Sequence, residues 1–510
     1  MAMTTKTARG VARKPGGALR RHVQAVLYFL IFDAKNHNQH ISSYFSYKRY
    51  NKMTLPSAFD SSSSAAAGIY RQNAFYIRMT SLFDLEPQGV DPVPTAVSMH
   101  AHEYIHFLHN ASTTAGQAYL HSNLILLRAI ASGCDDQGYF LGLAEMSEEG
   151  RNFLRYAATL MNAQLGTTSA KHLGGCNDIS LWKFNPPKIS KSEGVSIAIS
   201  TFSVQDENGT STNQEITIGL SFVTEGVAYE IDREMRRLAG TPDKDLDAQV
   251  SIFPYLAYRE AIRSWSGRNL QAHDLIAIGI TALSHLLPGF WLATICDALR
   301  NTDNSVSFVL EKARETCRND SRAILAALRE QRNDLSNGDV IWTAIGEYMK
   351  LVEAGVQLRQ KHWAPEFSFI SKPLEPEEFR NLIGSMLDCL VIQGKPNNEL
   401  DMYWIGPGLV ATNERTASCL GALQSALHFS QLHLKTDGSA SSTMALNGRS
   451  TSCPFSGGCQ QERNDQYPDA CKSSPWTRFT PSNPGEQVCW YAAGVKGLRN
   501  PANASDGDRS

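Results

Sequence analysis

The chain reads HAHEYIHFLHN at residues 100–110, a run that indicates both a helix and a metal site. Within it, His102, Glu103 and His106 form the short motif H-E-x-x-H. Residues four apart lie one above the other on a helix, so both histidines can present a ring nitrogen to one tetrahedral zinc ion. Glu103 then projects beside them, close enough to take a proton from a zinc-bound water. The motif therefore predicts a zinc ion at this helix.

The residues around the motif support a helix rather than a loop. A helical pattern starts at Thr95, directly after Pro94, whose fixed φ is tolerated at a helix start. A second helix is expected over residues 116–131, where leucines recur on one face. The other interpretation of the motif, histidines on a polar helix face, is disfavoured by the apolar residues on both sides of it.

A catalytic zinc ion needs a third protein ligand, and the motif helix does not supply it. His109 lies seven residues after His102, about 10 Å along the helix axis, too far for both to reach one ion with His106. We expect it to support the site or the fold. The metzincin pattern would require Gly at position 109 and His at position 112, where this chain has His109 and Ser112. That class is excluded.

The best candidate for the third ligand is Glu225, in the segment TEGVAYEID at residues 224–232. This segment is expected to open a helix, and the small Gly226 and Ala228 would let that helix pass close to the motif helix. Glu145, within the long interval between the two motifs, remains the alternative ligand.

With Glu225 as ligand, the chain resembles the gluzincin metallopeptidases. In these enzymes a glutamate from a downstream helix, often in an E-G-x-A context, joins the H-E-x-x-H helix. The resemblance covers residues 95–265 at most, and it implies a zincin-like core, a catalytic zinc ion and a protein or peptide substrate. Gluzincins often carry an Asp four residues after the third ligand to orient a histidine. Position 229 is Tyr, so Asp232 or Asn110 is expected to take that task.

The expected reaction is hydrolysis of a peptide bond. Zinc lowers the pKa of its water toward ~7, and Glu103 takes the proton and later delivers it to the leaving amine. In the resembled family a Tyr or His often stabilises the oxyanion, which makes Tyr255 or Tyr258 the candidate here, although both could be ordinary packing residues. The alternatives are a non-catalytic zincin-like interaction protein, against which the intact Glu103 argues, and zinc-dependent hydrolysis of a non-peptide bond.

The rest of the chain predicts an α+β fold that is predominantly helical. Alternating apolar residues on both sides of Asn208-Gly209 indicate a β-hairpin, beginning near residue 195. Further helices are expected at 224–238, 255–265, 271–286, 289–300, 304–317, 321–333, 338–358 and 376–392. The expected parts are a disordered basic arm (1–20), a zincin-like metallopeptidase core (21–265), a helical domain (266–435), a Cys-rich module (436–495) and a disordered tail (496–510).

Four of the ten cysteines gather near the C-terminus: Cys453, Cys459, Cys471 and Cys489. Such a cluster favours a second, structural zinc ion or an iron–sulfur cluster, although the spacing is not that of a zinc ribbon. Disulfides or unrelated cysteines remain open. The other six cysteines are scattered singly, as in reduced proteins, and this favours a cytoplasmic location.

Composition excludes several classes of protein. The chain has 510 residues, of which 42% are hydrophobic and 19% charged, so it is not wholly disordered. Forty-eight Lys and Arg against 50 Asp and Glu leave a net charge of -2, which gives no general attraction to nucleic acid. No apolar run approaches the ~20 residues of a membrane span, and no small-x-small cleavage site follows the apolar run at 23–32. The oligomeric state is not indicated.

Overall fold

The computed structural model describes residues 68–170, 173, 178–192, 195–205, 210–248, 250–333, 340–395, 400–408, 414–435, 439–446, 451–456, 468–478 and 489–499. The chain divides into two compact units, residues 1–49 with 191–195, and residues 50–190 with 196–510. Almost every described residue belongs to the second unit. The expected arm at 1–20 and residues 500–510 of the expected tail lie outside the described residues.

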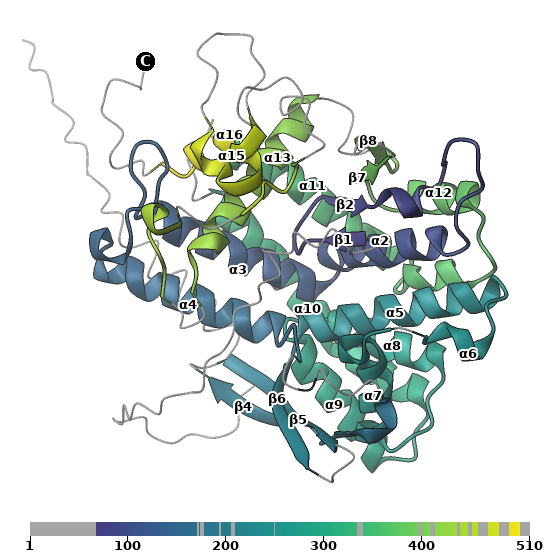
Figure 1. Cartoon of the computed structure of the whole chain (residues 1–510). Helices are drawn as coiled ribbons and strands as arrows, with labels where there is room; N and C mark the ends of the chain where they lie inside the picture. The colour runs from purple at the N-terminus through teal and green to yellow at the C-terminus, as the bar shows by residue number, and fades with distance from the viewer. Residues whose placement is uncertain are drawn as a thin grey trace, which may run out of the picture. The chain divides into compact units, whose positions relative to one another are not determined.

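Helices form most of the second unit, as the sequence predicts (Figure 1). They are α2 (Ala96–Ser112), α3 (Thr114–Ala131), α4 (Glu148–Leu165), α5 (Leu220–Leu238), α6 (Asp243–Leu246), α7 (Ala257–Ser266), α8 (Ala272–Leu283), α9 (Pro288–Asn301), α10 (Val306–Asn333), α11 (Val340–Lys361), α12 (Pro376–Gly384), α13 (Glu414–His433), α15 (Pro468–Ser473) and α16 (Trp490–Lys496). Short helical turns are η3 (Ser81–Phe83), η4 (Leu143–Glu145), η6 (Ile179–Leu181), η7 (Ile252–Leu256), η8 (Pro365–Ile370), η10 (Thr443–Leu446) and η11 (Pro475–Thr477). In the part of the chain described, no helix is long and apolar enough to span a membrane.

One four-stranded sheet joins distant parts of the chain. Its strands, in spatial order, are β1 (Gly68–Tyr70), β2 (Tyr76–Met79), β7 (Cys389–Gly394) and β8 (Leu400–Ile405). β2 and β7 are parallel, whereas the two outer pairs are antiparallel. This sheet thus takes two strands from the expected core at 21–265 and two from the expected helical domain at 266–435.

The expected helix at 376–392 is wrong in its second half. Helix α12 ends at Gly384, and every residue of β7 is buried. The segment CLVIQG is a short continuous apolar run, which suits a strand of a parallel pair as well as a buried helix, and periodicity alone does not separate the two. The expected helices at 304–317 and 321–333 are one continuous helix, α10.

The predicted hairpin is present. Strands β5 (Val195–Gln205) and β6 (Ser211–Ile218) pair antiparallel from Ala198 with Ile218 to Gln205 with Ser211. On its other side β5 pairs with β3 (Trp182–Phe184). A further strand, β4, covers Lys188–Ser192. Alternating burial along β5 matches the period of two in the sequence, since one face of the strand packs on the core.

Helix α2, which carries the H-E-x-x-H motif, lies inside the unit. It packs against α3, α5, α11 and the strands β1 and β2, and all its residues except Met99 are buried. Tyr104, within the motif, accepts a hydrogen bond from the Leu387 N–H at 3.1 Å and donates one to the Leu387 carbonyl at 3.2 Å. These bonds tie the motif helix to the residues just before β7. Because buried polar groups need partners, the many polar residues of α2 must be satisfied by neighbouring elements.

Candidate metal centre

Helices α2 and α5 pack against each other and bring three ligand atoms together. His102 Nε2 and His106 Nε2 are 3.1 Å apart, and Glu225 Oε2 lies 3.7 Å from the first and 3.3 Å from the second. Three ligands about 2.1 Å from one tetrahedral ion are separated by roughly 3.4 Å. The triangle thus has the size that a bound metal ion requires. Within the described ranges, these residues form the one group of this kind.

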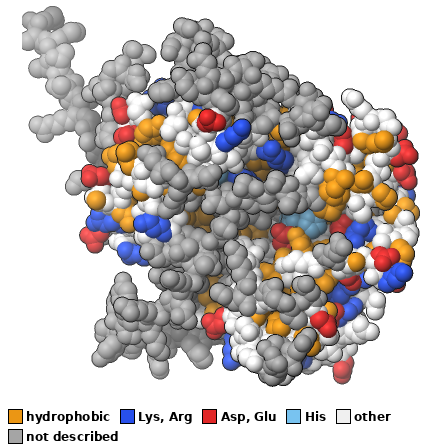
Figure 2. Space-filling view, in the orientation of Figure 1, with side chains coloured by type: hydrophobic (Ala, Val, Ile, Leu, Met, Phe, Trp, Pro, Cys, Tyr) orange, Lys and Arg blue, Asp and Glu red, His pale blue; other side chains and the backbone are white. Residues whose placement is uncertain are grey.

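The alternative ligand, Glu145, is not part of this group. It lies exposed on η4, whereas the Glu225 side chain is about one quarter exposed beside two buried histidines. In the space-filling view a small area of histidine side chain is exposed near α2 and α5, and acidic and hydrophobic side chains lie next to it (Figure 2). The structure therefore brings together His102, His106 and Glu225, and leaves Glu145 elsewhere.

The charges around the group suit a cation. Burial lowers the pKa of His102, but the nearby carboxylates of Glu225, Glu103 and Asp232 outweigh it and raise that pKa to about 9. Burial raises the pKa of Glu225, but the two histidines hold it well below its usual range. With both imidazoles neutral, the carboxylates leave a negative charge that a divalent cation would balance.

Glu103 is buried beside the group and is covered by strand β1. The backbone N–H of Tyr70 donates a hydrogen bond to its carboxylate, while burial raises its pKa. A Cβ atom at Gly68 would lie 2.6 Å from Glu103 Cγ and 2.8 Å from Oε1. Residue 68 must therefore be glycine for β1 to pass this close. Sequence reasoning missed this residue, because SSSSAAAG at 61–68 has the composition of a flexible loop.

The structure separates the two tyrosines expected near the site. Tyr255, on η7, has its ring centroid 5.8 Å from that of His102 and lies beside Glu225. The Glu225 charge and burial raise the pKa of Tyr255, so the hydroxyl stays protonated. Tyr258 instead donates to the Leu275 carbonyl at 2.9 Å, away from the three ligand atoms.

The role expected of Gly226 also differs from the one observed. A Cβ atom at this position would lie 2.0 Å from Cγ of Tyr258. Gly226 therefore makes room for α7, not for the motif helix. Sequence spacing predicts that a small residue is needed on α5 but does not predict which neighbour requires it.

Neither residue expected to orient a histidine ligand touches a ligand ring. Asp232 Oδ2 accepts from Arg236 at 2.7 Å, and its Oδ1 has no hydrogen-bond partner among the described residues. Asn110 donates to Gln72 Oε1 at 2.6 Å and to the backbone carbonyl of His106 at 3.1 Å. Asp232 acts on His102 through its charge, and Asn110 acts on the backbone of α2.

The residue that does touch a ligand ring is Thr224, which directly precedes Glu225. Its Oγ1 lies 3.2 Å from His106 Nδ1 and 2.6 Å from His109 Nδ1. His109 Nε2 in turn lies 3.3 Å from Glu366 Oε1. Sequence reasoning gave His109 a supporting position but missed Thr224 and Glu366. Thr224 could have been chosen because it directly precedes the ligand Glu225, whereas Glu366 lies far along the chain.

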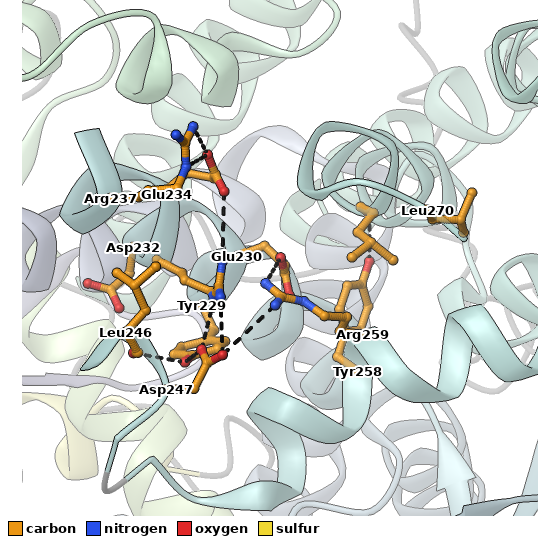
Figure 3. Close-up of polar contacts among 12 residues, drawn as sticks. Tyr229, Glu230, Asp232, Glu234, Arg237, Leu246, Asp247, Tyr258, Arg259 and Leu270 are labelled. Carbon is orange, nitrogen blue, oxygen red and sulfur yellow. Dashed lines mark hydrogen bonds and ion pairs between the residues drawn. The ribbon is translucent and has the colours of Figure 1, made fainter. Parts of the chain in front are cut away.

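An ionic network joins α5 to α7 and to the segment that follows α6 (Figure 3). Arg259 of α7 donates two hydrogen bonds to Glu230, at 3.0 and 2.6 Å, and Arg233 donates two to Asp247, at 2.7 and 3.2 Å. The Tyr229 hydroxyl also donates to Asp247, at 2.7 Å. Where the resembled family often has an Asp that orients a ligand, this chain thus has a Tyr that anchors α5 to the segment after α6.

Three of the four clustered cysteines are described, and all three are buried. The Cys453 N–H donates to the Cys471 carbonyl at 2.7 Å, and Arg478 Nη1 lies 2.7 Å from Cys471 Sγ. Cys453 and Cys489 both contribute to the raised pKa of Tyr491, after burial. Cys459 lies outside the described residues. A metal ion at these cysteines therefore stays a prediction.

Comparison of the chain with known proteins found no match among family models, curated proteins or solved structures. The functional inference therefore rests on the residues of the site.

Proposed function

We propose that the protein is a zinc-dependent metallopeptidase of gluzincin type, which hydrolyses peptide bonds in a protein or peptide substrate. The observation that supports this most is the triangle of His102 Nε2, His106 Nε2 and Glu225 Oε2, with Glu103 beside it. Two imidazoles and one carboxylate are a typical ligand set for catalytic zinc, and three protein ligands leave a fourth position for water or substrate.

The residues around the ligands divide the chemistry between them. When bound, zinc supplies a Lewis acid that makes water more acidic and polarises the scissile carbonyl. Glu103 accepts the proton of the attacking water and delivers it to the leaving amine. The Tyr70 N–H holds the Glu103 carboxylate in place. Tyr255, whose hydroxyl stays protonated, donates a hydrogen bond to the developing oxyanion.

The cytoplasm is the proposed location. Cys134, Cys296, Cys317, Cys389 and Cys419 are free thiols, and most of them are buried. Isolated unpaired cysteines are usual in a reducing compartment.

The test compares the metal content and peptidase activity of wild type and Glu103→Gln. Wild type should contain zinc at the His-His-Glu site and cleave peptides in a broad peptide library. Glu103→Gln should keep its zinc and its fold but lose roughly 10²–10⁴-fold in kcat, because the proton acceptor is gone. The matched control is Glu145→Gln, the same change at an exposed glutamate, which should leave both quantities unchanged.

Three results would contradict the proposal. A wild-type protein that contains no metal would show that His102, His106 and Glu225 do not form a metal site. A zinc-loaded wild type that hydrolyses no peptide would favour the interaction protein or a non-peptide substrate. A Glu103→Gln variant with wild-type activity would remove Glu103 as the general base.

A further inference from the structure

A line of buried polar groups leads away from the ligand His106. Its first contacts are the two made by Thr224 Oγ1, at 3.2 Å to His106 Nδ1 and at 2.6 Å to His109 Nδ1. His109 Nε2 lies 3.3 Å from Glu366 Oε1, and Arg359 forms an ion pair with Glu366. The line therefore crosses from α2 to α5, back to α2, and on to η8 and α11.

These contacts permit one consistent placement of the protons. If Nε2 of His106 holds a metal ion, its Nδ1 must carry the proton, and that proton is donated to Thr224 Oγ1. The Thr224 hydroxyl has a single proton of its own, which then goes to Nδ1 of His109. His109 is left with its proton on Nε2, facing the carboxylate of Glu366. Every proton thus points away from the metal, toward one anion.

The charges at the far end agree with this direction. Burial raises the pKa of Glu366, but Arg359 and His109 lower it to about 2, so the carboxylate is ionised. Burial lowers the pKa of His109 to about 4, so its imidazole is neutral. Arg359 is itself fixed, since its Nε donates to Ser112 Oγ at 2.8 Å. A neutral histidine between a hydroxyl and a fixed anion has only one favourable tautomer.

We infer that Thr224, His109 and Glu366 are positioning residues, which hold His106 in the tautomer and ring orientation that a metal ion needs. The inference rests on the proposed metal site and adds to it a support built from η8, about 140 residues beyond Glu225 in the chain. Groups that hydrogen-bond to a ligating histidine typically contribute 10–100-fold to metal affinity. This role would also explain why Thr224, His109 and Glu366 are buried together, since the burial of polar side chains costs desolvation free energy.

The experiment measures metal affinity, because a purely structural role would leave it unchanged. The full chain is stripped of metal and titrated with Zn²⁺ against a chelator, and with Co²⁺ to record the visible spectrum. Thr224→Val keeps the volume of residue 224 and removes its hydroxyl. It should weaken Zn²⁺ binding by about 10–100-fold and alter the Co²⁺ spectrum. Thr224→Ser, which keeps the hydroxyl, should restore both.

Two matched controls separate positioning from stability. Thr281 is fully buried on α8, and its hydroxyl donates to the Ala277 carbonyl at 2.8 Å, so Thr281→Val repeats the change away from the site. Glu366→Gln should weaken Zn²⁺ binding, by less than Thr224→Val does. Its control is Asp84→Asn, which neutralises another buried carboxylate paired with a cation, Lys395, and has no part in the line of contacts described above. Both controls should bind Zn²⁺ as wild type does.

The outcomes are distinguishable from those of the proposed function. Wild-type affinity in both Thr224→Val and Glu366→Gln would overturn the inference while leaving the metallopeptidase standing. Weakened Zn²⁺ binding in a protein that hydrolyses no peptide would support the inference and remove the peptidase. A wild type that binds no Zn²⁺ would overturn both.

Discussion

Gly68 packs against Glu103 so closely that a Cβ atom on residue 68 would lie 2.6 Å from the Glu103 Cγ atom. The Tyr70 N–H, two residues further along β1, donates to the same carboxylate. Strand β1 therefore restricts the position of the Glu103 side chain in two ways, by the close packing of Gly68 and by the hydrogen bond from Tyr70. This contact gives the first prediction.

Gly68→Ala should impair catalysis without removing the metal. The added methyl group must displace Glu103 or β1, and a misplacement of about 1 Å can cost on the order of 10²-fold in rate. Zinc content should be unchanged, because no ligand moves. Gly384→Ala is the control, since a Cβ atom there would have no neighbour from the described residues within 4 Å. Equal kcat in the two variants would show that β1 does not position Glu103.

Removing the third ligand should empty the site. Glu225→Ala should weaken Zn²⁺ binding by more than the 10–100-fold typical of residues that only support a ligand. Glu145→Ala should bind Zn²⁺ as wild type does, because Glu145 is exposed on η4. Equilibrium titration with a competing chelator measures both. The opposite ranking would make Glu145 the ligand.

The two tyrosines should respond differently to loss of their hydroxyls. Tyr255→Phe should lower kcat by about 10²–10³-fold at unchanged zinc content, as expected when a donor to an oxyanion is lost. Tyr258→Phe removes the bond to the Leu275 carbonyl and should lower the free energy of unfolding by about 1 kcal/mol with kcat intact. Steady-state kinetics and denaturant unfolding check the pair. Full activity of Tyr255→Phe would exclude it as the oxyanion donor.

The metal-free protein should lose stability as the pH falls from 6.5 to about 4. Burial lowers the pKa of His100 and His109 to about 4 and that of His428 further, so the unfolded chain takes up their protons first. Glu103 and Glu230, whose pKa values burial raises, oppose this trend with one proton each. Denaturant unfolding at several pH values measures the slope, and His100→Gln should reduce it. A stability that is flat or rises toward pH 4 would contradict this balance.

The cysteine cluster makes a separate prediction about metal stoichiometry. If these cysteines hold a second metal ion, wild type should carry close to two equivalents and Cys471→Ser close to one. The His-His-Glu site should keep its ion in that variant. Elemental analysis decides, and an equal metal count in the two proteins would exclude the second site.

The sequence predicted those parts of the site that lie on one helix or follow a short pattern. Residues 102 and 106 meet because i and i+4 share a helix face, and the pattern around Asn208-Gly209 specifies a hairpin. Glu225 could be chosen because of its local context. These features depend on near neighbours in the chain.

The contacts that the sequence did not predict are tertiary. Gly68 ends a segment with the composition of a loop, and only the structure shows that it packs against Glu103. Likewise, nothing in the sequence around Glu366 indicates that it faces His109. The apolar run at 389–394 has no period of two, so the sequence predicts a helix where the structure has the strand β7. In each case the deciding partner lies far away in the chain, where pattern and propensity carry no information.

The bonds between Tyr104 and Leu387 also set an order of events during synthesis. The two residues are 283 positions apart. At about 5–20 residues per second, a ribosome that has made the motif needs roughly 15–60 s more before Leu387 exists. Until then α2 cannot make these bonds, and β2 lacks its parallel neighbour β7. The proposed peptidase would thus complete its catalytic helix only late in translation, after most of the chain has emerged.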